Sequence, residues 1–224
     1  MSKTLDMDSF IECWKSFTET NKDHLLTKYD CSDWTNYICG EKKSTNDGSP
    51  FGDYFAKYFS DKYCYRKEDG LVDLAIFKER EFIKNIQKIA KRSNNETFSL
   101  GNFPTSYEVL IEHENDVKRA YEEMFKLTYF RAYLKVLVTY IWDPSGDEMW
   151  PEVHKQLSRN FESIIKQTNE KYPENVDTSY ILITGQRISG KLIWKYTGFS
   201  VMNTLKQTDS YVLVHDWTKP SINE

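Results

Sequence analysis

The sequence predicts an α/β fold in which a mixed β-sheet is flanked by helices. Residues 134–142, LKVLVTYIW, are apolar or β-branched almost throughout, as expected for a strand buried on both faces. Asp69-Gly70 separates two short strand-like runs, which is typical of a β-hairpin. Segments with helical spacing of apolar residues alternate with these strand patterns. At 224 residues, the chain is long enough to bury one sizeable core.

The first half of the chain predicts helices followed by the hairpin. Apolar residues at helical spacing predict helices over 7–28 and 51–61, the second with an aromatic face. The runs 62–67 and 71–77 are the predicted hairpin strands. Residues 78–92 predict a helix whose outer face carries six basic and two acidic residues. That face is either a solvated surface or a stripe that meets phosphate groups.

The second half predicts a β-α-β unit and an αβββ extension. Residues 107–111 predict a strand and residues 116–132 a helix, and the buried run 134–142 follows. Strand, helix and strand over about 35 residues are typical of a right-handed crossover between parallel strands. The expected later elements are a helix at 153–168 and strands at 180–185, 191–199 and 211–215.

Composition narrows the class of protein. The 15 Tyr, 13 Phe and 6 Trp indicate a packed globular chain, because disordered chains are poor in aromatic residues. No apolar run approaches the roughly 20 residues that span a bilayer, and the first residues lack the apolar core of a secretory signal. We therefore expect a cytoplasmic protein that does not bind membranes. The four cysteines lack zinc-finger spacing and predict ordinary thiols.

Acidic residues are placed unusually in the predicted strands. Asp73 interrupts the apolar strand 71–77, and Glu112 and Glu114 end the strand that begins at Tyr107. Side chains alternate along a strand, so both glutamates share one face and His113 points away. Carboxylates gathered at one place repel each other and raise each other's pKa. A hard divalent cation such as Mg²⁺ would remove that repulsion.

These residues resemble the PD-(D/E)XK nuclease superfamily, the restriction-endonuclease-like fold. The resemblance covers about residues 51–142 and implies an αβββαβ core, with an Asp on the second strand and an acid-x-Lys on the third. Glu112-His113-Glu114 departs from this pattern, since Glu114 stands where the lysine is expected. An E-x-E variant occurs among type II restriction endonucleases. The chain would then be one domain, 1–224, with extensions at 1–45 and 143–224.

The resemblance implies roles for individual residues. Asp73 and Glu112 would hold Mg²⁺ (or Mn²⁺), with the His113 carbonyl as a third ligand. Glu114 would position or deprotonate the attacking water, or bind a second metal ion. A lysine on the following helix would replace the missing one, Lys126 in preference to Lys118. A further metal-binding acid from the first helix would be Asp53, with Glu41 as the alternative.

The expected function is Mg²⁺-dependent hydrolysis of phosphodiester bonds in DNA by an endonuclease, in restriction or defence. RNA as the substrate is left open, and so is a homodimer that would cut both strands. The alternative is a catalytically inactive protein of the same fold that binds protein or nucleic acid. A third hypothesis is an interaction protein unrelated to nucleases, whose tryptophans serve an interface.

Overall fold

The computed structural model describes most of the chain. The described residues are 4–27, 31–40, 49–60, 63–69, 72–78, 106–141, 150–175, 177–188, 191–201 and 209–214. The predicted helix at 78–92, apart from Lys78, and Glu41 lie outside them.

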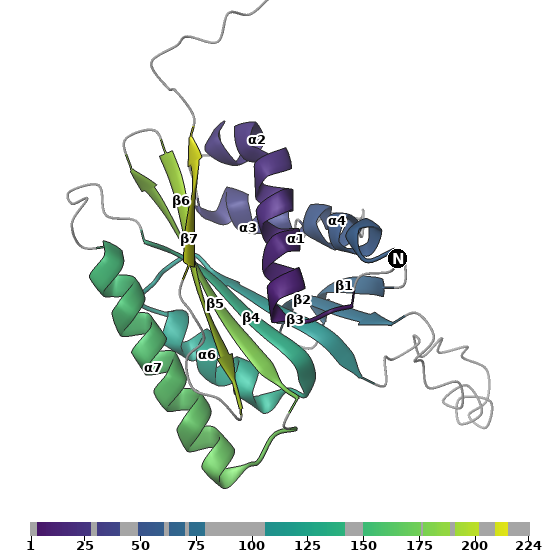
Figure 1. Cartoon of the computed structure of the whole chain (residues 1–224), viewed down its shortest axis with the longest axis vertical. Helices are drawn as coiled ribbons and strands as arrows, with labels where there is room; N and C mark the ends of the chain where they lie inside the picture. The colour runs from purple at the N-terminus through teal and green to yellow at the C-terminus, as the bar shows by residue number, and fades with distance from the viewer. Residues whose placement is uncertain are drawn as a thin grey trace, which may run out of the picture.

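One seven-stranded mixed sheet runs through the molecule, with its strands in sequence order. The strands are β1 (Tyr63–Asp69), β2 (Val72–Lys78), β3 (Tyr107–Glu114), β4 (Ala132–Ile141), β5 (Ser179–Ile188), β6 (Lys191–Ser200) and β7 (Asp209–Val214). Strands β1, β2 and β3 are antiparallel, β3, β4 and β5 are parallel, and β5, β6 and β7 are antiparallel again. A parallel block is thus enclosed by two antiparallel edges (Figure 1).

Helices cover both faces of this sheet (Figure 1). On one face lie the N-terminal helices, α1 (Met7–Thr20), α2 (Lys22–Thr27), α3 (Cys31–Cys39) and α4 (Pro50–Tyr58). On the other lie α6 (Ala120–Tyr129), which joins β3 to β4, and α7 (Trp150–Lys171), which joins β4 to β5. We call these the α1–α4 face and the α6–α7 face.

The core on the α1–α4 face is strongly aromatic. Trp14 of α1 packs edge-on against Phe51 and Trp194, with ring centroids 5.2 and 5.4 Å apart. Gly185 of β5 makes this contact possible, because a Cβ there would come within 2.7 Å of the Trp194 ring and 2.9 Å of the Tyr140 ring. Burial of such large rings is a major source of folding free energy.

The core on the α6–α7 face is mainly aliphatic. Leu110, Leu137 and Leu182 of the parallel strands lie under Met124 of α6 and Phe161 of α7. The parallel strands therefore carry apolar residues on both faces, which explains the continuous apolar run at 134–142.

The predicted α/β class, with a mixed sheet flanked by helices, is confirmed. Two helix predictions need correction. The predicted helix at 7–28 is divided into α1 and α2 at Asn21, whose side chain donates to the carbonyl of Phe17 at 2.8 Å. The helix predicted over 116–132 is shorter, because 116–119 form turns before α6 begins at Ala120.

Helix α3 was not predicted. It is short and contains Ser32, Asp33, Thr35 and Asn36, which are weak helix formers. Tertiary packing stabilises this helix in place of helix propensity, since its Trp34 and Ile38 are fully buried one turn apart. Gly40 ends the segment with a φ of 97°, the left-handed conformation common after helices.

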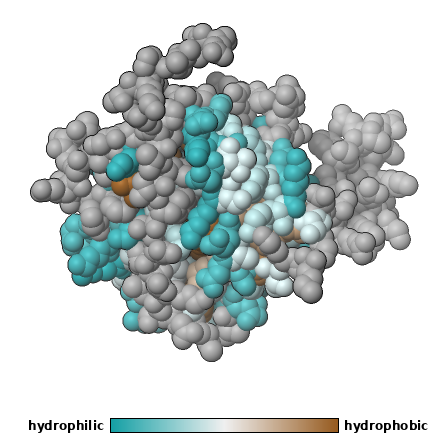
Figure 2. Space-filling view, turned by 45° about the horizontal axis from the view of Figure 1, so that its top comes forward, coloured by the Kyte–Doolittle hydropathy of each residue, from teal (hydrophilic) through white to brown (hydrophobic). Residues whose placement is uncertain are grey.

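The surface view gives no sign of a large apolar patch on the face it draws. The described residues there are mostly hydrophilic or of intermediate hydropathy (Figure 2). Among the helices of the described part, none combines the length and the apolar character needed to cross a bilayer.

Candidate functional site

Asp73 and Glu112 lie on neighbouring antiparallel strands. Leu74 of β2 is opposite Ile111 of β3, so the register places Asp73 opposite Glu112 one residue further. By alternation, both side chains lie on the α6–α7 face, as Ala75 and Leu110 do. The backbone N–H of His113 donates to Asp73 Oδ2 at 2.8 Å, which fixes this carboxylate beside the end of β3.

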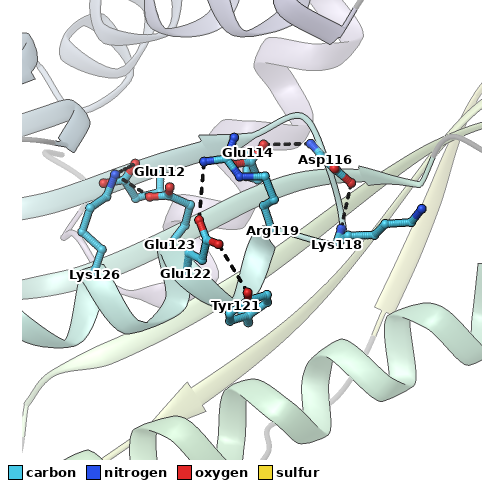
Figure 3. A network of polar contacts seen from close by, with 9 residues as sticks. All are labelled: Glu112, Glu114, Asp116, Lys118, Arg119, Tyr121, Glu122, Glu123 and Lys126. Atoms are coloured by element: carbon cyan, nitrogen blue, oxygen red, sulfur yellow. Dashed lines mark hydrogen bonds and ion pairs between the residues drawn. The ribbon is translucent and has the colours of Figure 1, made fainter.

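Glu112 is buried and bound to a lysine from α6. Its side chain is 1% exposed, and its Oε2 lies 2.9 Å from Lys126 Nζ. The same ammonium group contacts Glu123, three residues earlier on the helix (Figure 3). Asp73, Glu112, Glu123 and Lys126 are called the Glu112 cluster below. It contains three carboxyl groups and one ammonium group.

The Glu112 carboxyl group carries a strongly raised pKa of about 9. Burial is the largest cause and the nearby charge of Asp73 the next, and the opposing effect of Lys126 is smaller. Near neutral pH this carboxyl group therefore holds a proton. Its Oε1 is buried and has no hydrogen-bond partner within the described structure. The cluster thus has an incompletely satisfied acid at its centre.

Lys126 keeps its charge in this setting. Burial lowers the pKa of the ammonium group, but the contacts with Glu123 and Glu112 outweigh it and leave the pKa raised. The side chain is 27% exposed, so it connects buried Glu112 with solvent. Helix α6 can place it there because Met124 and Leu127 are fully buried against the sheet.

The other predicted residues near β3 point to different partners. Glu114 accepts a hydrogen bond at 2.8 Å from the backbone N–H of Asp116, and Arg119 forms a surface pair with Glu122 at 3.4 Å. Lys118 is exposed, and its side chain extends away from Glu112 (Figure 3). Lys126, and not Lys118, is therefore the lysine that the structure brings to the strand carboxylates.

His113 lies on the α1–α4 face, as alternation predicts. Thr35 Oγ1 donates to Asn115 Oδ1 at 2.8 Å, so it must accept from His113 Nδ1, which is 2.6 Å away. Tyr140 then donates its hydroxyl proton to Nε2 at 2.5 Å. Burial lowers the pKa of this imidazole to about 3, so it is neutral and structural. The imidazole therefore does not take part in the Glu112 cluster.

The structure does not bring Asp53 to these residues. Asp53 is in the first turn of α4, on the opposite face of the sheet, and accepts a hydrogen bond from Tyr65 at 2.8 Å. Tyr65 packs with the core of the α1–α4 face. The sheet thus separates Asp53 from Glu112, and Asp53 cannot share a metal ion with it.

Glu123 is a member of the cluster that sequence reasoning missed. Its spacing of three residues from Lys126 was the available signal, because residues three apart are neighbours on a helix. The role of Thr35 had no such signal, since it lies 78 residues from His113 in the sequence.

The residues of the Glu112 cluster fit a divalent cation in part. Mg²⁺ commonly needs only one or two protein carboxylates together with water and phosphate oxygens. Asp73 and Glu112 supply two, and Glu112 Oε1 has no protein partner in the described part. No set of three or more Asp, Glu, His or Cys side chains among the described residues is arranged to hold a metal ion by itself.

No family model, no curated protein and no solved structure matches the chain. The geometry of the Glu112 cluster and the resemblance of the sequence pattern are therefore the observations that bear on function.

Proposed function

We propose that this protein is a metal-dependent hydrolase that cuts phosphodiester bonds in DNA, of the PD-(D/E)XK type. The observation that carries the proposal is the 2.9 Å contact between Lys126 Nζ on α6 and Glu112 Oε2 on β3. Through this contact α6 places a lysine at the strand acids. In the sequence motif itself, Glu114 stands at the position where a lysine is expected. Asp73 lies on the same face of the sheet, opposite Glu112.

The order of elements supports the same proposal. Helix α4, strands β1, β2 and β3, helix α6 and strand β4 follow one another as αβββαβ. The three strands before α6 are antiparallel, and β4 is parallel to β3. This order of elements supports a core of the type that the sequence resemblance implies, although many unrelated activities can share a fold.

Each residue has a chemical task in this reaction. Asp73 and Glu112 would hold Mg²⁺ or Mn²⁺, which supplies Lewis-acid stabilisation of the phosphate and a more acidic water. Glu112 must first lose its proton, because its pKa is about 9 in the metal-free protein. Lys126 is then released from Glu112 and stabilises the charge that develops on the phosphate oxygens. Glu114 accepts the proton of the attacking water.

Cleavage of supercoiled plasmid in Mg²⁺ or Mn²⁺ tests the proposal. Glu112→Gln and Lys126→Met should each lower the cleavage rate at least about 100-fold, the loss typical of a single electrostatic group in an active site. Glu122→Gln is the matched control, since it removes an exposed α6 carboxylate that pairs with Arg119. Equal rates for Glu112→Gln and the control, or intact plasmid with every metal, would refute the nuclease.

A second candidate is a non-catalytic protein of the same fold. It is favoured by the internal partners of the acids, since Lys126 contacts Glu112 and the Asp116 N–H donates to Glu114. Calorimetric titration with Mg²⁺ separates the candidates. Heat that vanishes in Glu112→Gln supports the hydrolase, whereas no heat in the native chain supports the binding module.

A further inference from the structure

A polar row crosses the α6–α7 face of the sheet beyond Glu112. The pairing register aligns Glu114 of β3 with Thr139 of β4, Thr139 with Thr184 of β5, and Thr184 with Lys195 of β6. The preceding row on the same face has Leu137 and Leu182 at its centre. The change from apolar to polar thus occurs towards the carboxyl ends of the parallel strands. In open α/β sheets, ligands bind outside these ends.

Two side chains in this region each have a buried oxygen without a hydrogen-bond partner within the described structure. Thr139 is fully buried, and its Oγ1 has no hydrogen-bond partner within the described structure. Gln186 is 2% exposed, and its buried Oε1 also has none. Thr184, between them in the register, differs, because its hydroxyl contacts His154 Nδ1 at 2.6 Å. The same face therefore contains matched threonines with and without a partner.

Unpartnered polar atoms destabilise a core, so their presence in a group requires an explanation. Together with Glu112 Oε1, they form a diagonal over three adjacent strands. Successive members are one strand and two residues apart, so their Cα atoms are separated by about 8 Å. One metal ion cannot bridge such positions, since its ligands lie about 2–2.6 Å from it. The diagonal fits an extended ligand.

We infer that Thr139 and Gln186 bind the sugar-phosphate of the nucleotide next to the bond that the Glu112 cluster would cut. The inference rests on the proposed function and assigns its neighbouring binding position. The Thr139 hydroxyl can donate to a phosphate oxygen, and the Gln186 amide presents an oxygen and an NH₂ group that are alike in shape. Lys195 adds positive charge in the same row, where it contributes to the lowered pKa of His154. That positive charge lies at the end of the row opposite to Glu114.

Thr139→Val tests the inference because valine keeps the shape and removes only the hydroxyl. We expect its urea midpoint to equal or exceed that of the native chain, since no hydrogen bond is lost. Its dissociation constant for a fluorescein-labelled 12-base-pair DNA duplex should rise about tenfold. Binding is measured by fluorescence anisotropy with Ca²⁺ in place of Mg²⁺, and gels verify that the duplex stays intact. Gln186→Met should weaken binding in the same way.

Thr184→Val is the matched control. Its hydroxyl has the partner His154, so the variant should lower the urea midpoint and leave the dissociation constant unchanged. Native affinity in both Thr139→Val and Gln186→Met would overturn the inference, as would a native chain that does not bind the duplex. A native chain that binds in this pattern and cuts in no metal would refute the hydrolase while the binding position stands. If the native chain cuts DNA but Thr139→Val and Gln186→Met bind the duplex with native affinity, the hydrolase stands and the binding position is refuted.

Discussion

Two lysine–carboxylate clusters lie on the same face of the sheet and differ in how completely they are satisfied. Lys135 of β4 is fully buried and donates to Glu174 Oε1 at 2.6 Å and to the Tyr180 hydroxyl at 3.1 Å. Tyr180 in turn donates to Glu174. In the Glu112 cluster, one lysine contacts two of the three carboxyl groups, and a buried oxygen of Glu112 has no partner in the described part.

The difference separates a structural cluster from a candidate site. The Lys135 cluster consists of Lys135, Glu174 and Tyr180. Its ammonium group balances its one carboxylate, and the Tyr180 hydroxyl bridges them, so no further partner is needed for stability. Burial lowers the pKa of Lys135, and Glu174 opposes that effect. The Glu112 cluster instead holds an acid whose pKa is raised to about 9. Such a group is stabilised by a proton or by a cation, which is what a site that exchanges ligands requires.

Replacing the lysine of each cluster should give the largest difference in stability between the two clusters. Lys135→Met removes the cation that pairs with Glu174 in the described structure, in a largely buried position, and we expect a loss of about 3–5 kcal/mol in the free energy of unfolding. Lys126→Met should cost about 1 kcal/mol or less, since its side chain is 27% exposed. Urea denaturation at pH 7 measures both. Equal losses would remove the distinction between the clusters.

Replacement of each glutamate by glutamine should have opposite effects. Glu112→Gln imitates the protonated acid and should raise the free energy of unfolding at pH 8 by about 2 kcal/mol. Glu174→Gln removes the partner of a buried lysine and should lower it by about 2 kcal/mol. Urea titrations of both variants at pH 8 test the signs.

The dependence on pH follows from the raised pKa of Glu112. Between pH 4.5 and about 9, the folded chain holds a proton that the unfolded chain releases. This contribution to stability is present below pH 4.5 and is lost as the pH rises through about 9, with a slope of at most about 1.4 kcal/mol per pH unit. Glu112→Gln should reduce that slope, and an unaltered slope would contradict the assignment.

The sequence could predict one of these clusters and not the other. Asp73 and the pair Glu112 and Glu114 interrupt apolar strands, and strand alternation gives their faces directly. Lys126 is on the helix that must cover those strands. Lys135 lies in the buried run LKVLVTYIW, and its partner Glu174 is 39 residues away, beyond the end of α7. No local period encodes such a distant pair, so the Lys135 cluster was not predictable.

Asp53 shows what the sequence pattern alone does not determine. It has the right residue type and is in the helix that precedes the hairpin, but nothing local in α4 determines which face of the sheet the helix covers. Packing against another helix determines it, because Phe51 and Phe55 of α4 pack with Trp14 and Phe10 of α1. Tertiary packing between helices therefore decides which acids meet.

Tyr180→Phe tests how much the Tyr180 hydroxyl stabilises the Lys135 cluster. The variant removes one hydroxyl that donates to a carboxylate, and it leaves the Lys135–Glu174 pair in place. Hydrogen bonds to charged groups contribute about 1.5–3 kcal/mol, so we expect a loss near the lower end of that range. Thermal denaturation followed by circular dichroism measures it. A neutral effect would mean that Glu174 and Lys135 need no third member.

Mg²⁺ should act on the Glu112 cluster alone, with the smallest effect. At five times its dissociation constant, a ligand of the folded chain adds about 1 kcal/mol to the free energy of unfolding. Mg²⁺ competes with the proton on Glu112, so the added stability should be larger at pH 8 than at pH 6. Glu112→Gln should abolish the effect, while Tyr180→Phe should retain it. A Mg²⁺ effect of equal size at both pH values would place the ion elsewhere, because a site that includes Glu112 must release a proton in this range.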